Sequence, residues 1–66
     1  MKIYEAILAG EVRAYGQLSD IIRARGGTYN ELYELVCSIF EKAGRVPPPL
    51  EEFDDIMLEC DEIDRG

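Results

Sequence analysis

Three consecutive prolines divide this chain and limit what it can fold into. Pro47, Pro48 and Pro49 follow Val46, and because proline has a fixed φ and no backbone N–H, a helix cannot continue through them. The run is typical of an extended polyproline segment, after which a helix can begin at once. Within one domain of residues 1–66, the sequence predicts a head (residues 1–46), a hinge (residues 47–49) and a helix (residues 50–64).

The charge of the chain is divided at the same place. Fourteen acids and seven bases give a net charge of −7, and all of the excess follows residue 46, where eight acids stand against one base. This imbalance opposes direct contact with nucleic-acid phosphates and with anionic membranes. It favours a larger partner protein that has a basic surface or groove.

Length and composition exclude further classes of function. A chain of 66 residues forms a marginal core with little room for a multi-step active site. The absence of histidine removes the usual parts of most zinc sites and of most schemes that activate a nucleophile. Residues 61–66 contain some oxygen ligands of a calcium loop but lack the closing glutamate. We expect no enzyme activity, no catalytic residues, no metal site and no cofactor.

The start of the chain and its two cysteines point to a compartment. Glu5 interrupts the apolar first residues, and no window reaches eighteen apolar residues, which predicts neither a secretory signal nor a membrane span. Cys37 and Cys60 each fall in the buried stripe of an expected helix, where cysteine acts as a small hydrophobe. We expect a cytoplasmic protein.

Hydrophobic spacing predicts three helices in the head. The first covers residues 2–9, and the second covers about residues 16–25 after a short connector that contains Val12 and Tyr15. The third begins at Thr28, which matches a capping box with Glu31. We expect this third helix to be the longest and most buried element.

The segment after the prolines predicts a fourth helix with two different sides. Its apolar side chains recur at helical spacing, and its polar side is almost wholly acidic. The apolar positions are Leu50, Phe53, Ile56, Met57, Cys60 and Ile63. The sequence therefore predicts an all-α fold, in which a tri-helical, helix-turn-helix-like head is followed by an acidic amphipathic helix. Strand pairs for a wing are not evident.

Residues 3–8 together with residues 10–18 resemble the opening of one known DNA-binding domain. It is the winged-helix domain of the O6-alkylguanine DNA alkyltransferases and alkyltransferase-like proteins. That family places a proline, a reactive cysteine or a tryptophan, a histidine and an arginine after its recognition helix. This chain has Val46, the three prolines and Leu50 in the comparable region, so the resemblance implies the tri-helical architecture and none of the activity.

The acidic helix leads to the first functional hypothesis. We expect a small non-enzymatic regulator that binds and modulates, or inhibits, a larger basic protein, for example one that processes nucleic acid. The residues expected to bind it are Glu51, Glu52, Phe53, Asp54, Asp55, Met57, Glu59, Asp61 and Ile63. In the competing interpretation, the apolar side of the helix packs on the head and the acids form an ordinary solvated face.

Two other hypotheses stay open. The first is a helix-turn-helix transcription regulator, in which Arg13, Arg23, Arg25, Lys42 and Arg45 contact DNA. The second is a structural subunit that self-associates, for example as a homodimer, through the stripes of the third and fourth helices. The four tyrosines of the head either stack on bases or fill the core with their hydroxyls at its rim.

Overall fold

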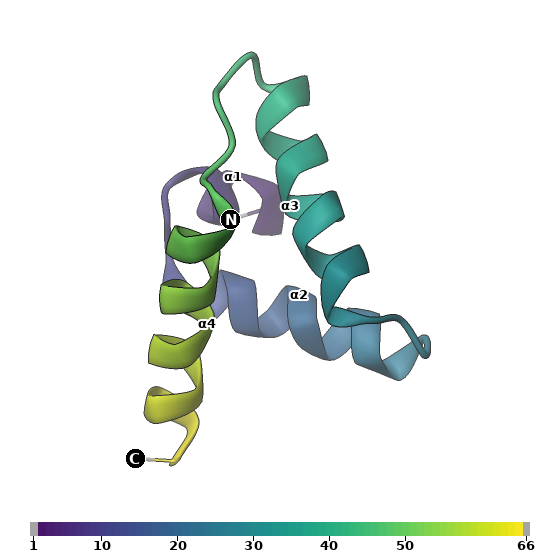
Figure 1. Ribbon diagram of the computed structural model, residues 1–66, viewed down its shortest axis with the longest axis vertical. Coiled ribbons are helices and arrows are strands. Elements are labelled where there is room, and N and C mark those ends of the chain that lie inside the picture. Colours follow the sequence, from purple (N-terminus) through teal and green to yellow (C-terminus); the bar gives the residue numbers. More distant parts are fainter. Residues whose placement is uncertain (1, 66) are drawn as a thin grey trace.

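The structure is a computed structural model, which describes residues 2–65 and the side chains of residues 2–63. This part of the chain contains four helices. They are α1 (Ile3–Leu8), α2 (Val12–Ala24), α3 (Tyr29–Lys42) and α4 (Leu50–Arg65). In Figure 1, α2 lies across the lower part of the view, α3 rises from one end of α2, and α4 descends past the other end, so that α3 and α4 run in opposite chain directions. The predicted all-α fold with four helices is confirmed.

The second helix begins earlier than the sequence pattern indicated. α2 starts at Val12, and the carbonyl of Glu11 already accepts hydrogen bonds from the N–H groups of Ala14 and Tyr15. The turn after α1 needs only a few residues because Gly10 adopts a φ of 80°, a left-handed conformation that glycine takes without strain. Val12 and Tyr15 therefore belong to the first turn of a helix and not to a connector.

The third helix begins as the capping pattern predicts. Thr28 Oγ1 accepts a hydrogen bond of 3.2 Å from the backbone N–H of Glu31, which satisfies one of the free donors at the helix start. At the other end, Gly44 follows Lys42 and has a φ of 73°. α3 has 14 residues and α4 has 16, so the expectation that the third helix is the longest is wrong.

The fourth helix is long because nothing interrupts it. After Pro49 the sequence has no proline or glycine before Gly66, and the carbonyl of Pro49 accepts the first helical hydrogen bond from Phe53 N–H. Residues 61–65 continue the helix and do not form a loop. The last residue of the calcium-loop pattern lies outside the described part of the chain.

The proline segment does not hold α4 away from the head. α4 packs back on the head, chiefly against α2. The radius of gyration is 11.2 Å, close to the ~11 Å expected when 66 residues form one packed unit. A marginal head needs the apolar side of α4 to complete its core, so residues 47–49 act as a connecting segment between two packed helices.

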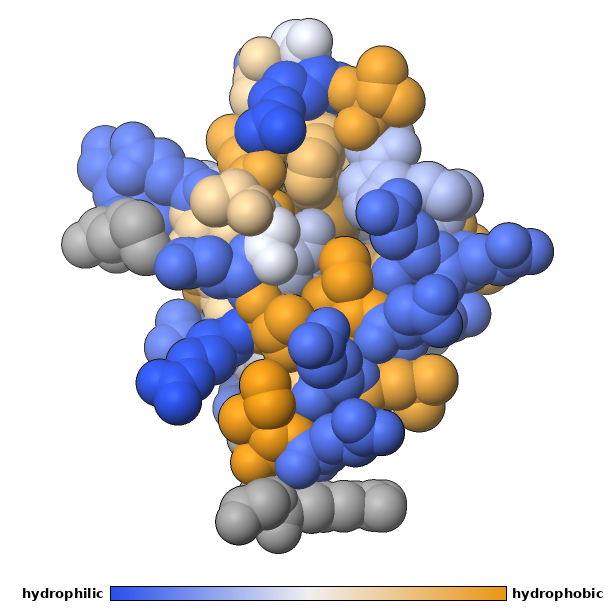
Figure 2. All heavy atoms as spheres, turned by 90° about the vertical axis from the view of Figure 1, so that its left-hand side faces the viewer, coloured by the Kyte–Doolittle hydropathy of each residue, from blue (hydrophilic) through white to orange (hydrophobic). Residues whose placement is uncertain are grey.

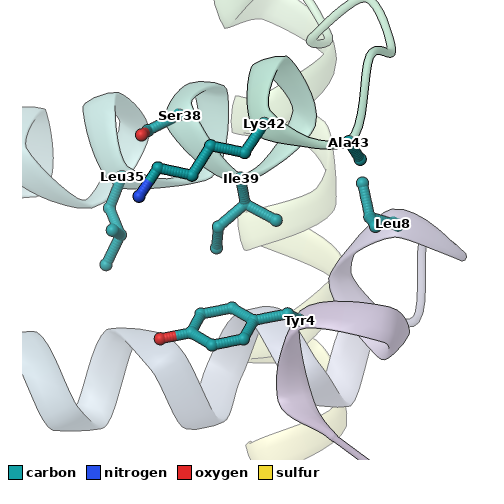
Figure 3. Close-up of a pocket in the computed structure, with 7 residues that line it drawn as sticks. All are labelled: Tyr4, Leu8, Leu35, Ser38, Ile39, Lys42 and Ala43. Atoms are coloured by element: carbon teal, nitrogen blue, oxygen red, sulfur yellow. The ribbon is translucent and has the colours of Figure 1, made fainter.

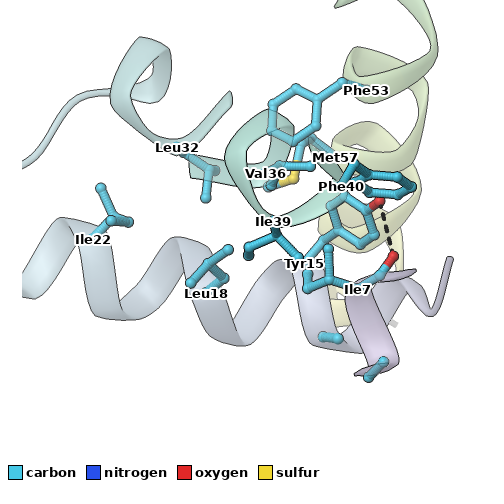
Figure 4. Packing of buried hydrophobic residues seen from close by; sticks show 12 residues of the cluster. Ile7, Tyr15, Leu18, Ile22, Leu32, Val36, Ile39, Phe40, Phe53 and Met57 are labelled. Atoms are coloured by element: carbon cyan, nitrogen blue, oxygen red, sulfur yellow. Dashed lines mark hydrogen bonds between the residues drawn. The ribbon is translucent and has the colours of Figure 1, made fainter. Parts of the chain in front are cut away.

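One hydrophobic core joins all four helices. Ile7 of α1, Tyr15 of α2, Val36 of α3 and Phe53 of α4 are each at most 1% exposed. Figure 4 shows these side chains converging from different helices, with the hydroxyl of Tyr15 donating to the carbonyl of Ile7 at 3.3 Å. Within residues 2–65, no helix has the length and apolar character needed to cross a membrane.

Candidate protein-binding surface

Phe53 attaches the inner side of α4 to the head. Its ring is surrounded by the rings of Tyr15, Tyr29 and Tyr33, with centroid distances of 6.0, 5.4 and 5.1 Å. Tilted aromatic pairs of this kind each contribute about 0.5–1.5 kcal/mol beyond the burial of their surface. This socket fixes the rotation of α4 about its own axis, and therefore also fixes which side chains α4 presents to solvent.

Two residues expected to contact a partner lie in this core instead. Phe53 is 0% exposed and Met57 is 9% exposed, so a partner cannot reach them while α4 is packed on the head. Binding of a partner through these two residues would require α4 to leave the head. The third apolar residue of that set, Ile63, is 48% exposed and stays accessible near the end of α4.

Tyrosine hydroxyl groups tie α4 and its connecting segment to α3. Tyr33 donates a hydrogen bond of 2.9 Å to the carbonyl of Pro48, and Tyr29 donates to Oδ1 of Asp54. A guanidinium also takes part in tying the connecting segment to the head, because Arg45 donates to the carbonyl of Leu8 in α1 at 2.9 Å. Tyr15 and Tyr33 therefore fill the core with their hydroxyls at its rim, the second of the two roles that the sequence suggested, whereas Tyr29 and Tyr4 are 47% and 55% exposed.

The surroundings of Tyr15, Tyr29 and Tyr33 raise the pKa of each of these three side chains. Burial, the hydrogen bond to Asp54 and the negative charges of Asp54 and Asp61 raise the pKa of Tyr29 to about 12. Burial and the charge of Glu52 raise the pKa of Tyr15. Hydrogen bonding with Cys37 and burial raise the pKa of Tyr33. All three hydroxyls hold their protons more firmly because the surroundings disfavour a tyrosinate anion.

The outer side of α4 is a dense surface of carboxylates. Of the acids expected to bind a partner, Asp54 is half-buried, and the others are exposed: Glu51, Glu52, Asp55, Glu59 and Asp61. Figure 2, which views the side on which α4 lies, shows hydrophilic side chains with apolar ones between them. No lysine or arginine occurs from residue 50 to residue 64, so α4 itself supplies no cation there to neutralise the acids.

An exposed leucine stands among these acids. Leu58 is 61% exposed, and its neighbours three and four positions away on the helix are Asp54, Asp55, Asp61 and Glu62. We call Glu51, Asp55, Leu58 and Glu62 the acidic face. Leu58 was not among the residues predicted to bind a partner, because it lies outside the apolar stripe of the helix. The available signal was that Leu58 follows Met57 directly and so points to another side of the helix.

The cations of the DNA-binding hypothesis are spread over the head. Arg23 and Arg25 precede α3, whereas Lys42 and Arg45 lie at its far end. The 14 residues of α3 separate the two pairs by ~21 Å at 1.5 Å per residue. Arg45 also stacks over the Phe40 ring at 5.7 Å. Arg13 lines a separate hollow with Cys60 and Ile63.

The chain matches no protein-family model, no curated protein and no solved structure. The resemblance of residues 3–18 to an alkyltransferase domain therefore stays a hypothesis.

Proposed function

We propose that this chain is a small, non-enzymatic, cytoplasmic protein-binding module that binds and modulates a larger protein through the acidic face of α4. The observation that carries the proposal is the exposure of Leu58, 61%, among carboxylates on a helix whose opposite side is buried through Phe53. An exposed apolar side chain ringed by charges of one sign matches a basic groove that contains an apolar socket.

Electrostatics and preorganisation give the two parts of this surface different roles. The carboxylates attract a cationic surface over distances of about 10 Å at 0.1 M salt, which raises the rate of encounter. Leu58 then supplies apolar contact area in the centre, where the residues that dominate binding energy usually lie. Because Phe53 already holds α4 on the head, little conformational entropy is lost on binding.

The test removes charge and anchor separately from the full chain. Wild type and a triple variant are each bound to a resin, and the proteins that they retain from a lysate of the source cell are compared at low and high salt. The triple variant carries Glu51→Gln, Asp55→Asn and Glu62→Gln. The matched control, Glu5→Gln, Glu34→Gln and Glu41→Gln, removes the same charge from exposed positions of α1 and α3. Truncation after Val46 is unsuitable because it removes part of the core.

The proposal predicts one dominant protein that wild type and the control retain, and that the triple variant loses. Leu58→Ser should lose the same protein with every charge intact, whereas Ile21→Ser, which changes an apolar residue that is 49% exposed on α2, should retain it. Equal retention by all variants, or retention of duplex DNA with no dependence on the acidic face, contradicts the proposal. The second result would support the DNA-binding alternative.

A further inference from the structure

A groove on the opposite part of the head is independent of the acidic face. It lies between α1 and α3, has a volume of about 380 Å³, and is lined by Tyr4, Leu8, Leu35, Ser38, Ile39 and Lys42 among others. The groove exists because α1 has only 6 residues and turns away at Gly10, while α3 continues for 14. Ligand sites in proteins commonly begin at about 300 Å³.

The two ends of this groove differ in chemistry. Leu8, Leu35 and Ile39 form an aliphatic floor, and Ile39 is only 8% exposed. In Figure 3, the ammonium of Lys42 and the hydroxyls of Ser38 and Tyr4 point to one end of the groove, away from Leu8. Leu35 lies at that end as well, so the polar groups share one end of the groove with an aliphatic side chain, while the end at Leu8 is apolar.

The polar groups at that end are available to a ligand. Among the residues that the structure describes, none forms a hydrogen bond or ion pair with the side chains of Tyr4, Ser38 or Lys42. Tyr4 is 55% exposed, so its ring and hydroxyl are accessible from solvent. One ammonium and two hydroxyl donors suit a single negative charge on an oxygen acid.

We propose that this groove binds a medium-chain aliphatic carboxylate, with the carboxylate on Lys42, Ser38 and Tyr4 and the chain along Leu8, Leu35 and Ile39. One ammonium balances a monoanion and does not balance a phosphate dianion. The groove belongs to the head, where acids and bases are equal in number up to residue 46. None of the residues that line it comes from the acidic helix α4.

The experiment titrates the ¹⁵N-labelled full chain with octanoate and monitors the chemical shifts of its backbone amides. The octanoate concentration stays below the value at which micelles form. The expected result is saturable shifts confined to α1 and α3, with affinity that rises from hexanoate to decanoate. Octanol, which has the same chain without the charge, should bind about tenfold more weakly, the effect of losing ~1.4 kcal/mol of charge-assisted hydrogen bonding. Octyltrimethylammonium should not bind.

Two charge-matched variants test the role of Lys42. Lys42→Gln should lower octanoate affinity about tenfold and leave octanol binding unchanged, whereas Arg23→Gln, at an exposed position of α2, should change neither. Unsaturable shifts, equal binding of the cationic amphiphile, or no effect of Lys42→Gln would overturn the proposal. Tighter binding of a peptide with a C-terminal Leu-Leu than of any fatty acid would also overturn it and assign the groove to a protein terminus. None of these variants changes α4. A negative result for the groove therefore leaves the proposal that the acidic face binds a partner protein untouched.

Discussion

The backbone of Gly16 lies directly against the sulfur of Cys60. A Cβ atom built on Gly16 would be 2.5 Å from Sγ of Cys60, a distance that packed atoms do not reach without movement. Gly16 is in the interior of α2 and Cys60 is buried on α4. The helices therefore meet where α2 has no side chain, and the close approach depends on glycine.

Replacing this glycine should destabilise the protein. Glycine to alanine inside an exposed helix ordinarily stabilises by about 0.5–1 kcal/mol, but here Gly16→Ala should lower the free energy of unfolding by ~1–3 kcal/mol because the added methyl overpacks the core. Urea unfolding followed by circular dichroism measures the change. In a Cys60→Ala background, the same substitution should become neutral or stabilising. Stabilisation by Gly16→Ala alone would show that the helices do not meet in this way.

Removing the ring of Phe53 should unfold most of the molecule. Phenylalanine to alanine in a core costs ~3–5 kcal/mol, and a domain of this length has a total stability of ~3–10 kcal/mol at 0.05–0.15 kcal/mol per residue. Phe53→Ala should therefore lose most helical signal near body temperature, and Phe53→Leu should lose much less. Leu58→Ala, on the exposed side of the same helix, should stay within about 0.5 kcal/mol of wild type. Comparable losses at both positions would contradict the packing of α4.

Stability should fall at high pH because folding raises the pKa values of Tyr15, Tyr29 and Tyr33. Tyr29 titrates at about 12 in the folded chain against an ordinary value of 10.0, so the folded state binds its proton more tightly than the unfolded state. The associated stability is complete below pH 10 and is lost as the pH rises toward 12. Thermal unfolding from pH 8 to 12 should show this fall. It should be smaller in Tyr29→Phe, and an unchanged profile would exclude the contribution of Tyr29.

The start of α3 should depend on one hydroxyl group. Thr28→Ala removes the oxygen that accepts from Glu31 N–H and should lower the free energy of unfolding by about 1 kcal/mol. Thr28→Ser keeps the acceptor and should remain close to wild type. Denaturant unfolding of the three proteins provides the comparison. If alanine and serine lower the stability equally, the loss comes from the threonine methyl group and not from the cap.

Local signals in the sequence predicted the helix ends best. Thr28 was placed correctly because a cap acts within a few residues of chain. The start of α2 was predicted too late. The pattern around Val12 and Tyr15 does not show that the turn after α1 is already made at Gly10. A short apolar segment next to a glycine is compatible with either a connector or a first helical turn.

The candidate surface was predicted in part. The acids from Glu51 to Asp61 were recognised from charge alone, and most of them are exposed. Phe53 and Met57 were assigned to a partner as well because an amphipathic pattern shows that one side of a helix is buried but does not show against what. Leu58 could be recognised as an anchor only after the rotation of α4 on the head was known.

The sequence by itself determined the number and kind of elements and the position of the charge. Helical periodicity, caps and proline act over a few residues, and the acids after Pro49 are a matter of composition. Only the tertiary structure decided that α4 packs on its own head, with Phe53 among three tyrosines, and that α1 and α3 leave a groove between them. Those features depend on contacts between residues distant in the chain, such as Gly16 with Cys60, whose fit follows from three-dimensional shape and not from local pattern.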